Sequence, residues 1–399
     1  MNILFYIPNI DKSFGGVFQY SLALLSIMSK SEHQYFLYKT ENTDIKALIV
    51  NHKNLHILSS NDYIEPLSIR IARKSINNIN SILRKFRVKY KIKFTYQNIH
   101  IDYIIKKFKI DIIHCPFQSL QESSWGIPTI TTMHDVQELH FPEFFTSKER
   151  ASRAVRYKNA IDNADAVIVS YQHIKNDLIK YFAKEEYKIH VCLLDMQNLW
   201  FEKFSSYDIL ELKEYNLPEK FILYPAASWE HKNHLKLIEA INILKEEKNI
   251  VVNLICTGHI TEFYTIIEKQ IEKYNLEKQV KFIGTVSDQV LFSLYHKTAA
   301  VVIPTLYEAG SFPLMESVIM GIPVICSNVT SLPETIGDNS FIFNPMDPNE
   351  IAEKIYRILT NEDYKNYNIK NIEKLAHRIR KNDTINIMNS IYKALTGTN

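Results

Sequence analysis

Short runs of β-branched and aromatic residues alternate with longer amphipathic helical patterns along most of the chain, and this alternation constrains the fold more than any other feature. Such a pattern predicts parallel sheets built from strand–helix–strand units. It lapses after Leu194 and starts again at Phe221. The expected strands are 3–7, 34–38, 111–115, 129–133, 166–170 and 189–194 in the first half, and 221–224, 251–256, 280–283, 300–304 and 323–326 in the second.

A chain of 399 residues exceeds the size at which one hydrophobic core usually stops growing, so two domains are expected. We place an N-terminal domain at 1–200 and a C-terminal domain at 201–399, with the last helix as a candidate to return to the N-terminal domain. A polar, helix-prone connector is predicted at 205–215. The predicted fold class is α/β, with two Rossmann-like, doubly wound parallel sheets facing a cleft. In such sheets ligands bind beyond the carboxyl ends of the strands.

The cysteines and the hydrophobic pattern narrow the class of protein. The four cysteines lie far apart without a CxxC pair, which predicts reduced thiols and no metal site. No apolar stretch approaches the roughly 20 residues that span a bilayer, and no basic leader precedes the first strand. These features predict a cytoplasmic protein.

The N-terminal half is basic, with 26 Lys and Arg against 19 Asp and Glu in residues 1–200. Much of the excess lies in 70–93, where basic residues alternate with apolar ones and no acid intervenes. This composition suits an anionic membrane surface, and equally a solvated helix whose apolar side joins the core. Nucleic acid is not an expected partner, because the stretch contains no recognition module.

Two glutamates follow the strand predicted at 300–304. Pro313 suits the first turn of a helix, which puts Glu308 on the preceding loop and Glu316 one turn into the helix. Free amides at such a helix start bind anions, and a carboxylate can accept hydrogen bonds from two neighbouring hydroxyls. The residues expected at the anion are Gly310, Ser311 and Phe312.

The span from Glu308 to Glu316, followed by Gly321-Ile-Pro323 and by Ser331-Leu-Pro-Glu334, resembles the E-x7-E signature of family 4 of the retaining GT-B glycosyltransferases. In that family the first glutamate contacts the donor sugar and the second contacts the nucleotide ribose. The resemblance implies these roles for Glu308 and Glu316.

The loop after the strand 221–224 contains Lys232 and Asn233 and resembles the donor-phosphate loop of the same family. Lys232 is the expected cation on the diphosphate, with Asn233 beside it. The sequence departs from the family at Ala226 and Ala227, where a Gly-Arg pair is common. His231 is a candidate substitute for the missing cation.

Two loops of the N-terminal half complete the resemblance. Gly15 and Gly16 resemble the glycine loop that approaches the donor phosphates or the acceptor, and they do not form a dinucleotide fingerprint. His134 and Asp135 follow the strand 129–133 and resemble the family's His-Asp pair. This implies that His134 contacts the donor sugar or the acceptor while Asp135 orients its ring. His114 is a weaker candidate.

The resemblance implies a retaining hexosyltransferase that moves a sugar, with mannose as first candidate, from a GDP- or UDP-linked donor to a glycan acceptor. A lipid-linked acceptor in bacterial surface polysaccharide synthesis, as O-antigen or capsule, is the expected context, with the inner face of the membrane as a peripheral location. No cofactor or metal is expected, because the sequence contains no Asp-x-Asp pair. A nucleotide-sugar 2-epimerase of the same fold and a non-catalytic membrane-docking partner stay open as alternatives.

Overall fold

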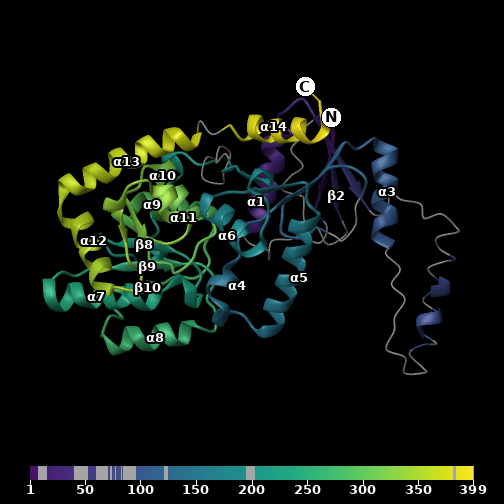
Figure 1. Ribbon diagram of the computed structural model, residues 1–399. Coiled ribbons are helices and arrows are strands. Elements are labelled where there is room, and N and C mark those ends of the chain that lie inside the picture. The colour runs from purple at the N-terminus through teal and green to yellow at the C-terminus, as the bar shows by residue number, and fades with distance from the viewer. Residues whose placement is uncertain are drawn as a thin grey trace.

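The computed structural model describes residues 1–7, 16–39, 53–59, 96–120, 125–194, 203–380 and 383–398, with a few residues between 71 and 83. Two parallel sheets with helices on both faces form two domains that lie side by side (Figure 1). The predicted pair of doubly wound domains is therefore confirmed. Gly15 lies outside the described residues, and so do all basic residues of the 70–93 stretch except Lys74.

The N-terminal sheet has seven described strands in the order β3-β2-β1-β4-β5-β6-β7. All neighbours are parallel, and Ile3 of β1 pairs with Ile112 of β4. Strand β3 was not predicted, and it is an edge strand. The strands are β1 (Asn2–Tyr6), β2 (Gln34–Lys39), β3 (Leu55–Ser59), β4 (Ile112–Cys115), β5 (Thr129–Thr132), β6 (Ala166–Val169) and β7 (Ile189–Val191).

Side chains alternate between the two faces of this sheet, and each face has its own core. Ile3 and Phe5 pack against α1 and against the last helix, α14 (Thr384–Thr396), whereas Leu4 and Tyr6 pack against α3, α5 and α6. Burial of both faces explains why the strands read as continuous apolar runs. The helices are α1 (Gly16–Met28), α3 (Tyr96–Phe108), α4 (Gln137–His140), α5 (Ser147–Asn163) and α6 (Gln172–Phe182), with 3-10 turns η4 (Pro142–Phe144) and η5 (Glu186–Lys188).

The C-terminal sheet has the order β10-β9-β8-β11-β12-β13, again parallel throughout. Its two-residue last strand was not predicted, and β9 begins three residues later than expected. The strands are β8 (Ile222–Pro225), β9 (Leu254–Thr257), β10 (Val280–Phe282), β11 (Ala300–Ile303), β12 (Val324–Ser327) and β13 (Ile342–Phe343).

Helices on both faces of this sheet share one large core with its strands. The amphipathic α12 and α13 pack together and cover α7 and α10 respectively. They are α7 (His234–Lys248), α8 (Tyr264–Lys273), α9 (Asp288–Lys297), α10 (Phe312–Met320), α11 (Ser331–Ile336), α12 (Pro348–Thr360) and α13 (Glu362–Arg380), with 3-10 turns η9 (Glu230–Lys232) and η10 (Asn339–Phe341).

The connector between the domains is not the helix that the sequence predicts. The part of the connector that the structure describes includes the short 3-10 turns η7 (Ser206–Asp208) and η8 (Lys213–Tyr215). Asp208 closes the first turn by accepting hydrogen bonds from both the amide and the hydroxyl of Ser205. Leu212 and Asn216 adopt left-handed backbone conformations, which stop a right-handed helix from propagating.

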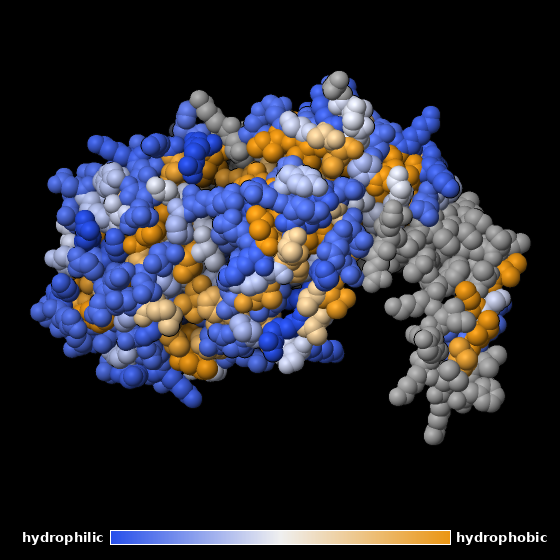
Figure 2. Space-filling view, in the orientation of Figure 1, coloured by the Kyte–Doolittle hydropathy of each residue, from blue (hydrophilic) through white to orange (hydrophobic). Residues whose placement is uncertain are grey.

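The last helix, α14 (Thr384–Thr396), packs in the N-terminal domain. Its Tyr392 hydroxyl lies 2.8 Å from His114 Nδ1. Figure 1 shows the two chain ends close together, and the Thr396 hydroxyl donates to Met1 Sδ at 3.5 Å. Figure 2 shows apolar side chains reaching the surface along the junction of the domains.

Candidate functional site

The strand order of the C-terminal sheet locates a crevice between β8 and β11. The chain winds outward in opposite directions from this pair of strands, so the loops after them part and leave room for a ligand. Lys232 lies after β8 and Glu308 lies after β11. The topology therefore brings together two residues that are 76 positions apart in the sequence.

Lys232 and Glu308 form an ion pair, with Nζ 2.6 Å from Oε1. Both side chains are largely shielded, at 19% and 12% exposure, so water screens the contact less than it would a surface pair. The loop of Lys232 is fixed to the loop of Glu308, since the carbonyl of His231 accepts hydrogen bonds from the Leu306 amide and the Thr305 hydroxyl. The pair is thus held on two rigid loops.

Asn233 holds Lys232 in place rather than facing a ligand with its amide. Its φ of 61° lies in the left-handed region, which asparagine tolerates at a turn. Its side-chain amide donates to the carbonyls of Pro304 and Pro345 at 2.8 Å each. Both donor hydrogens of this amide are therefore used within the fold, and the contact of Asn233 with the donor stays a prediction.

The main chain of Glu308 is fixed by Thr330, a residue that the sequence did not single out. The Thr330 hydroxyl accepts from the Glu308 amide at 3.0 Å and donates to the Glu308 carbonyl at 2.7 Å. Thr330 has φ 49° and ψ −117°, a conformation that is costly for a β-branched residue. The strained residue holds the glutamate that carries the predicted chemistry.

Helix α10 begins where the sequence predicts, with Pro313 in its first turn. Ser311 is the N-cap, and its hydroxyl accepts from the Leu314 amide at 3.4 Å. Glu316 is buried one turn further along, and the Tyr295 hydroxyl donates to its carboxylate at 2.6 Å. The two glutamates are consequently separated into a loop position and a helix position.

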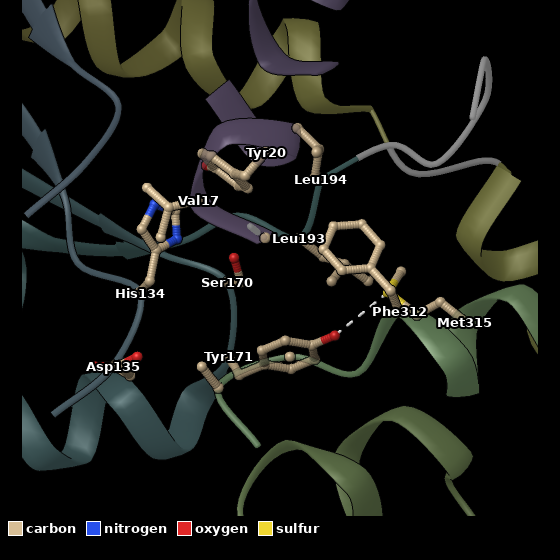
Figure 3. Close-up of a pocket in the computed structure, with 13 residues that line it drawn as sticks. Val17, Tyr20, His134, Asp135, Ser170, Tyr171, Leu193, Leu194, Phe312 and Met315 are labelled. Atoms are coloured by element: carbon tan, nitrogen blue, oxygen red, sulfur yellow. Dashed lines mark hydrogen bonds between the residues drawn. The ribbon is translucent and has the colours of Figure 1, made fainter. Parts of the chain in front are cut away.

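A central pocket of about 320 Å³ lies between the domains, and Figure 3 shows the side chains around it. It brings together residues predicted from both halves of the sequence, although Lys232, Glu308 and Glu316 do not line it. Ala309, next to Glu308, does. The predicted residues that line the central pocket are Gly16, His134, Asp135, Gly310 and Phe312.

His134 is held by groups other than Asp135. Its Nε2 lies 3.1 Å from the Pro116 carbonyl, and its ring meets the edge of Tyr20 with centroids 4.6 Å apart. Burial lowers the pKa of His134, so the ring is neutral near pH 7. The Asp135 carboxylate lies 3.5 Å from Arg153, and its role in orienting the His134 ring stays a prediction.

Several contacts across the cleft involve residues that the sequence did not indicate. The Tyr171 ring lies so close to Gly310 that a β-carbon there would be 2.9 Å from Cε2, and its hydroxyl donates to Met315 Sδ. The Gln172 amide at the start of α6 donates to Glu334 of α11 at 3.0 Å. Tyr171, Met315 and Gln172 carry no sequence signal, because their contacts form only once the two domains face each other.

No group of three His, Cys, Asp or Glu side chains that could hold a metal ion occurs among the residues that the structure describes. Within the same residues, no helix has the length and apolar character needed to cross a membrane.

Two family models match the chain. The model described as Glycosyl transferases group 1 matches residues 210–375, and the Glycosyltransferase Family 4 model matches residues 14–192. The chain belongs to family 4 of the GT-B glycosyltransferases. The resemblance to family 4 that the sequence shows and the predicted GT-B fold are therefore both confirmed.

Relatives of this family 4 chain include three bacterial mannosyltransferases. O-antigen chain mannosyltransferase B of Escherichia coli is 25% identical over 237 residues, covering 59% of this chain and 62% of that protein. The serotype-specific mannosyltransferase WbdA of Escherichia coli is 27% identical over 279 residues, which cover 68% of this chain and only 32% of WbdA. O-antigen chain mannosyltransferase RfbU of Salmonella typhimurium is 22% identical over 379 residues, covering 94% and 92% of the two chains.

Solved structures share the fold over the whole length. A glycosyltransferase from Rickettsia africae has a TM-score of 0.70 at 20% identity, covering 100% of this chain and 99% of that one. HepE of Anabaena, solved in complex with UDP and glucose, has a TM-score of 0.68 at 16% identity and is covered completely, as is this chain. At these identities the likeness concerns the fold alone.

Proposed function

We propose that this chain is a hexosyltransferase that moves mannose from a nucleoside diphosphate sugar to a glycan acceptor in O-antigen or related surface polysaccharide synthesis. The observation that carries the proposal is the Lys232–Glu308 pair at the crevice between β8 and β11, adjoining the start of α10. The mannosyltransferase names of the relatives support the choice of sugar.

The reaction places negative charge on the leaving diphosphate. In our proposal the free amides at the N-terminus of α10 and the Lys232 ammonium meet that charge, and no metal is needed. The positive charge of Lys232 is balanced by the carboxylate of Glu308. A bound diphosphate would therefore share the lysine ammonium with this glutamate. Glu308 then faces the sugar, where its carboxylate stabilises developing positive charge at the anomeric carbon.

We propose retention of configuration, with an oxygen of the leaving phosphate taking the proton of the attacking acceptor hydroxyl. The neutral ring of His134, on the opposite wall of the cleft, is the proposed contact to the sugar or to the acceptor. Glu316, fixed by Tyr295, is the proposed ribose contact. A GDP- or UDP-linked donor, a lipid-linked acceptor and a peripheral membrane location through residues 70–93 stay predictions.

The test is a screen of GDP- and UDP-linked hexoses for nucleoside diphosphate release and for transfer to a glycan acceptor, run both with and without EDTA. We expect Glu308→Gln to lower turnover by about 100-fold or more while nucleotide affinity stays within a few-fold. Glu353→Gln is the matched control, because Glu353 is about half exposed on α12, beyond the core of the C-terminal domain.

Unchanged turnover in Glu308→Gln would overturn the assignment. Release of an epimerised sugar without transfer would point to the 2-epimerase instead, and loss of activity in EDTA would refute the metal-free part of the proposal.

A further inference from the structure

A second hollow, of about 890 Å³, lies between the domains and is distinct in its lining from the central pocket. One wall consists of the loops after β8 and β9, and the other consists of η4 and the start of α5. We call it the Trp229 hollow, after the exposed aromatic residue in its first wall. Of the residues discussed from the sequence, only His231 lines it.

Hydrogen bonds between Ser228 and the 259–261 loop make the first wall rigid. The Thr261 amide donates to the Ser228 hydroxyl at 2.7 Å, and the Thr261 hydroxyl donates to the Ser228 carbonyl at 2.7 Å. The Ser228 amide donates in turn to the His259 carbonyl at 3.0 Å. A wall fixed in this way loses little conformational entropy when a ligand binds.

Large apolar side chains face water in this hollow. Trp229 is 52% exposed and Ile260 is 44% exposed, on the two loops that these hydrogen bonds join. Phe144 approaches His231 from the opposite wall, with ring centroids 6.2 Å apart. Exposed aromatic residues at a hollow between domains indicate a binding surface, and the C–H side of a pyranose ring packs well on an aromatic face.

The negative charge of the side chains that line the Trp229 hollow disfavours the binding of anionic ligands there. Glu143, Glu230 and Glu262 are exposed here, and none of them forms an ion pair with another described residue. The one arginine, Arg153, is occupied by Asp135 and Glu138. Unpaired carboxylates accept hydrogen bonds from hydroxyl groups and repel phosphates and acidic sugars. The hollow therefore suits a neutral, hydroxyl-rich ligand.

The Trp229 hollow adjoins the proposed reaction centre through two neighbouring residues. His231 lines it, and the next residue, Lys232, pairs with Glu308. Burial lowers the pKa of His231 to about 3, so this residue adds no positive charge at the junction. In our proposal, a chain of sugars that reaches Glu308 extends past the neutral His231 into the hollow.

We infer that the Trp229 hollow binds neutral sugar units of the acceptor glycan beyond the unit that reacts, with Trp229 as the stacking platform. The identification of the ligand as the acceptor glycan rests on the proposed transferase function. Binding of a sugar to the hollow can be measured without any transfer reaction.

The experiment is calorimetric titration of the full chain with mannotriose, the neutral probe, and with trigalacturonate, an acidic probe of the same length. We expect mannotriose to bind and trigalacturonate to bind at least about tenfold more weakly. Trp229→Ala should weaken mannotriose binding about tenfold, while Trp229→Phe should stay within about threefold. Tyr207→Ala is the matched control, because Tyr207 is 97% exposed on η7.

Titration with GDP and UDP separates this inference from the proposed function. Nucleotide binding and transfer, with mannotriose affinity unaffected by Trp229→Ala, would overturn the inference and leave the transferase proposal intact. Mannotriose binding that depends on Trp229, without nucleotide binding, would support the hollow and refute the transferase. If Trp229→Ala fails to fold, Ile260→Asp takes its place, since Ile260 is exposed in the same wall.

Discussion

At the scale of single residues, the site combines side chains that the sequence indicates with others that only the fold brings in. Glu308, Glu316 and Lys232 follow from the resemblance to the motifs of family 4, and the structure adds the Lys232–Glu308 contact. Thr330 could not be found in this way, because its role depends on a strained backbone and on a contact across 22 residues. A threonine in a loop carries no signal of either.

Thr330 yields a test of whether fixing the Glu308 main chain matters for turnover. Thr330→Val keeps the shape but removes the hydroxyl that bonds the Glu308 amide and carbonyl. We expect kcat to fall about tenfold with donor KM changed less, and the free energy of unfolding to fall by about 1–3 kcal/mol.

Thr330→Ser is the control, because it retains the hydroxyl and should keep most of the activity. Steady-state kinetics and urea unfolding measure both effects. A Val variant that is less stable but fully active would show that Thr330 serves the fold alone.

At the scale of helices and strands, sequence periodicity predicts the central strands of both sheets, since burial of both faces gives each a continuous apolar run. It misses β3 and β13, which lie at sheet edges and are short or partly exposed. It also predicts a helix in the connector, where Ser205–Asp208 bonding and left-handed residues form tight turns. In the connector, the backbone conformations of single residues therefore determine the secondary structure.

The contact between β4 and α14 yields a prediction on acid stability. Burial lowers the pKa of His114 to about 3 from an ordinary value of 6.5. Below pH 6.5 the unfolded chain binds a proton at this residue that the folded chain does not, so stability falls as pH drops from 6.5 towards 3. The slope from this group is about 1.4 kcal/mol per pH unit at most.

Urea unfolding of the wild type and of His114→Asn between pH 7.5 and 4.5 measures this effect. The variant loses the hydrogen bond to Tyr392, so its free energy of unfolding at pH 7.5 should be lower than that of the wild type. At this pH the histidine is neutral in both the folded and the unfolded chain, so titration adds no further difference. Below pH 6.5 the gap between the two proteins should narrow, because the variant lacks the titrating ring. Parallel curves at all pH values would rule out His114 as a source of acid sensitivity.

At the scale of the whole molecule, the two domains meet through contacts that require close approach. The Tyr171 ring packs on Gly310, Gly16 lies beside Phe312, and Glu334 accepts from the first amide of α6. A carboxylate at a helix N-terminus is favoured by the exposed amides and the helix dipole. The architecture was predictable from the sequence, but the closeness of the domains was not, because it depends on pairs of residues from opposite halves.

Gly310→Ala tests how much the fit of the domains contributes. The backbone of Gly310 does not lie in the left-handed region, so the backbone accepts alanine, and the atoms nearest to the added methyl group belong to the Tyr171 ring. We expect the clash to hold the cleft more open and to raise the donor KM about tenfold.

Combining Tyr171→Leu with Gly310→Ala should bring the donor KM part of the way back towards the wild-type value. If the two residues were independent, the free-energy effects of the two substitutions on KM would add. Kinetics of the two single variants and the double variant complete the cycle. Additive losses would mean that the Tyr171–Gly310 contact does not govern closure.

The return of α14 makes the C-terminal domain an insertion within the N-terminal one. The chain leaves the N-terminal core after Leu194, completes the second core by Ile379, and enters the first core again at Met388. The chain therefore crosses between the domains twice. These two crossings restrict the rotation of one domain relative to the other to an axis that passes through both.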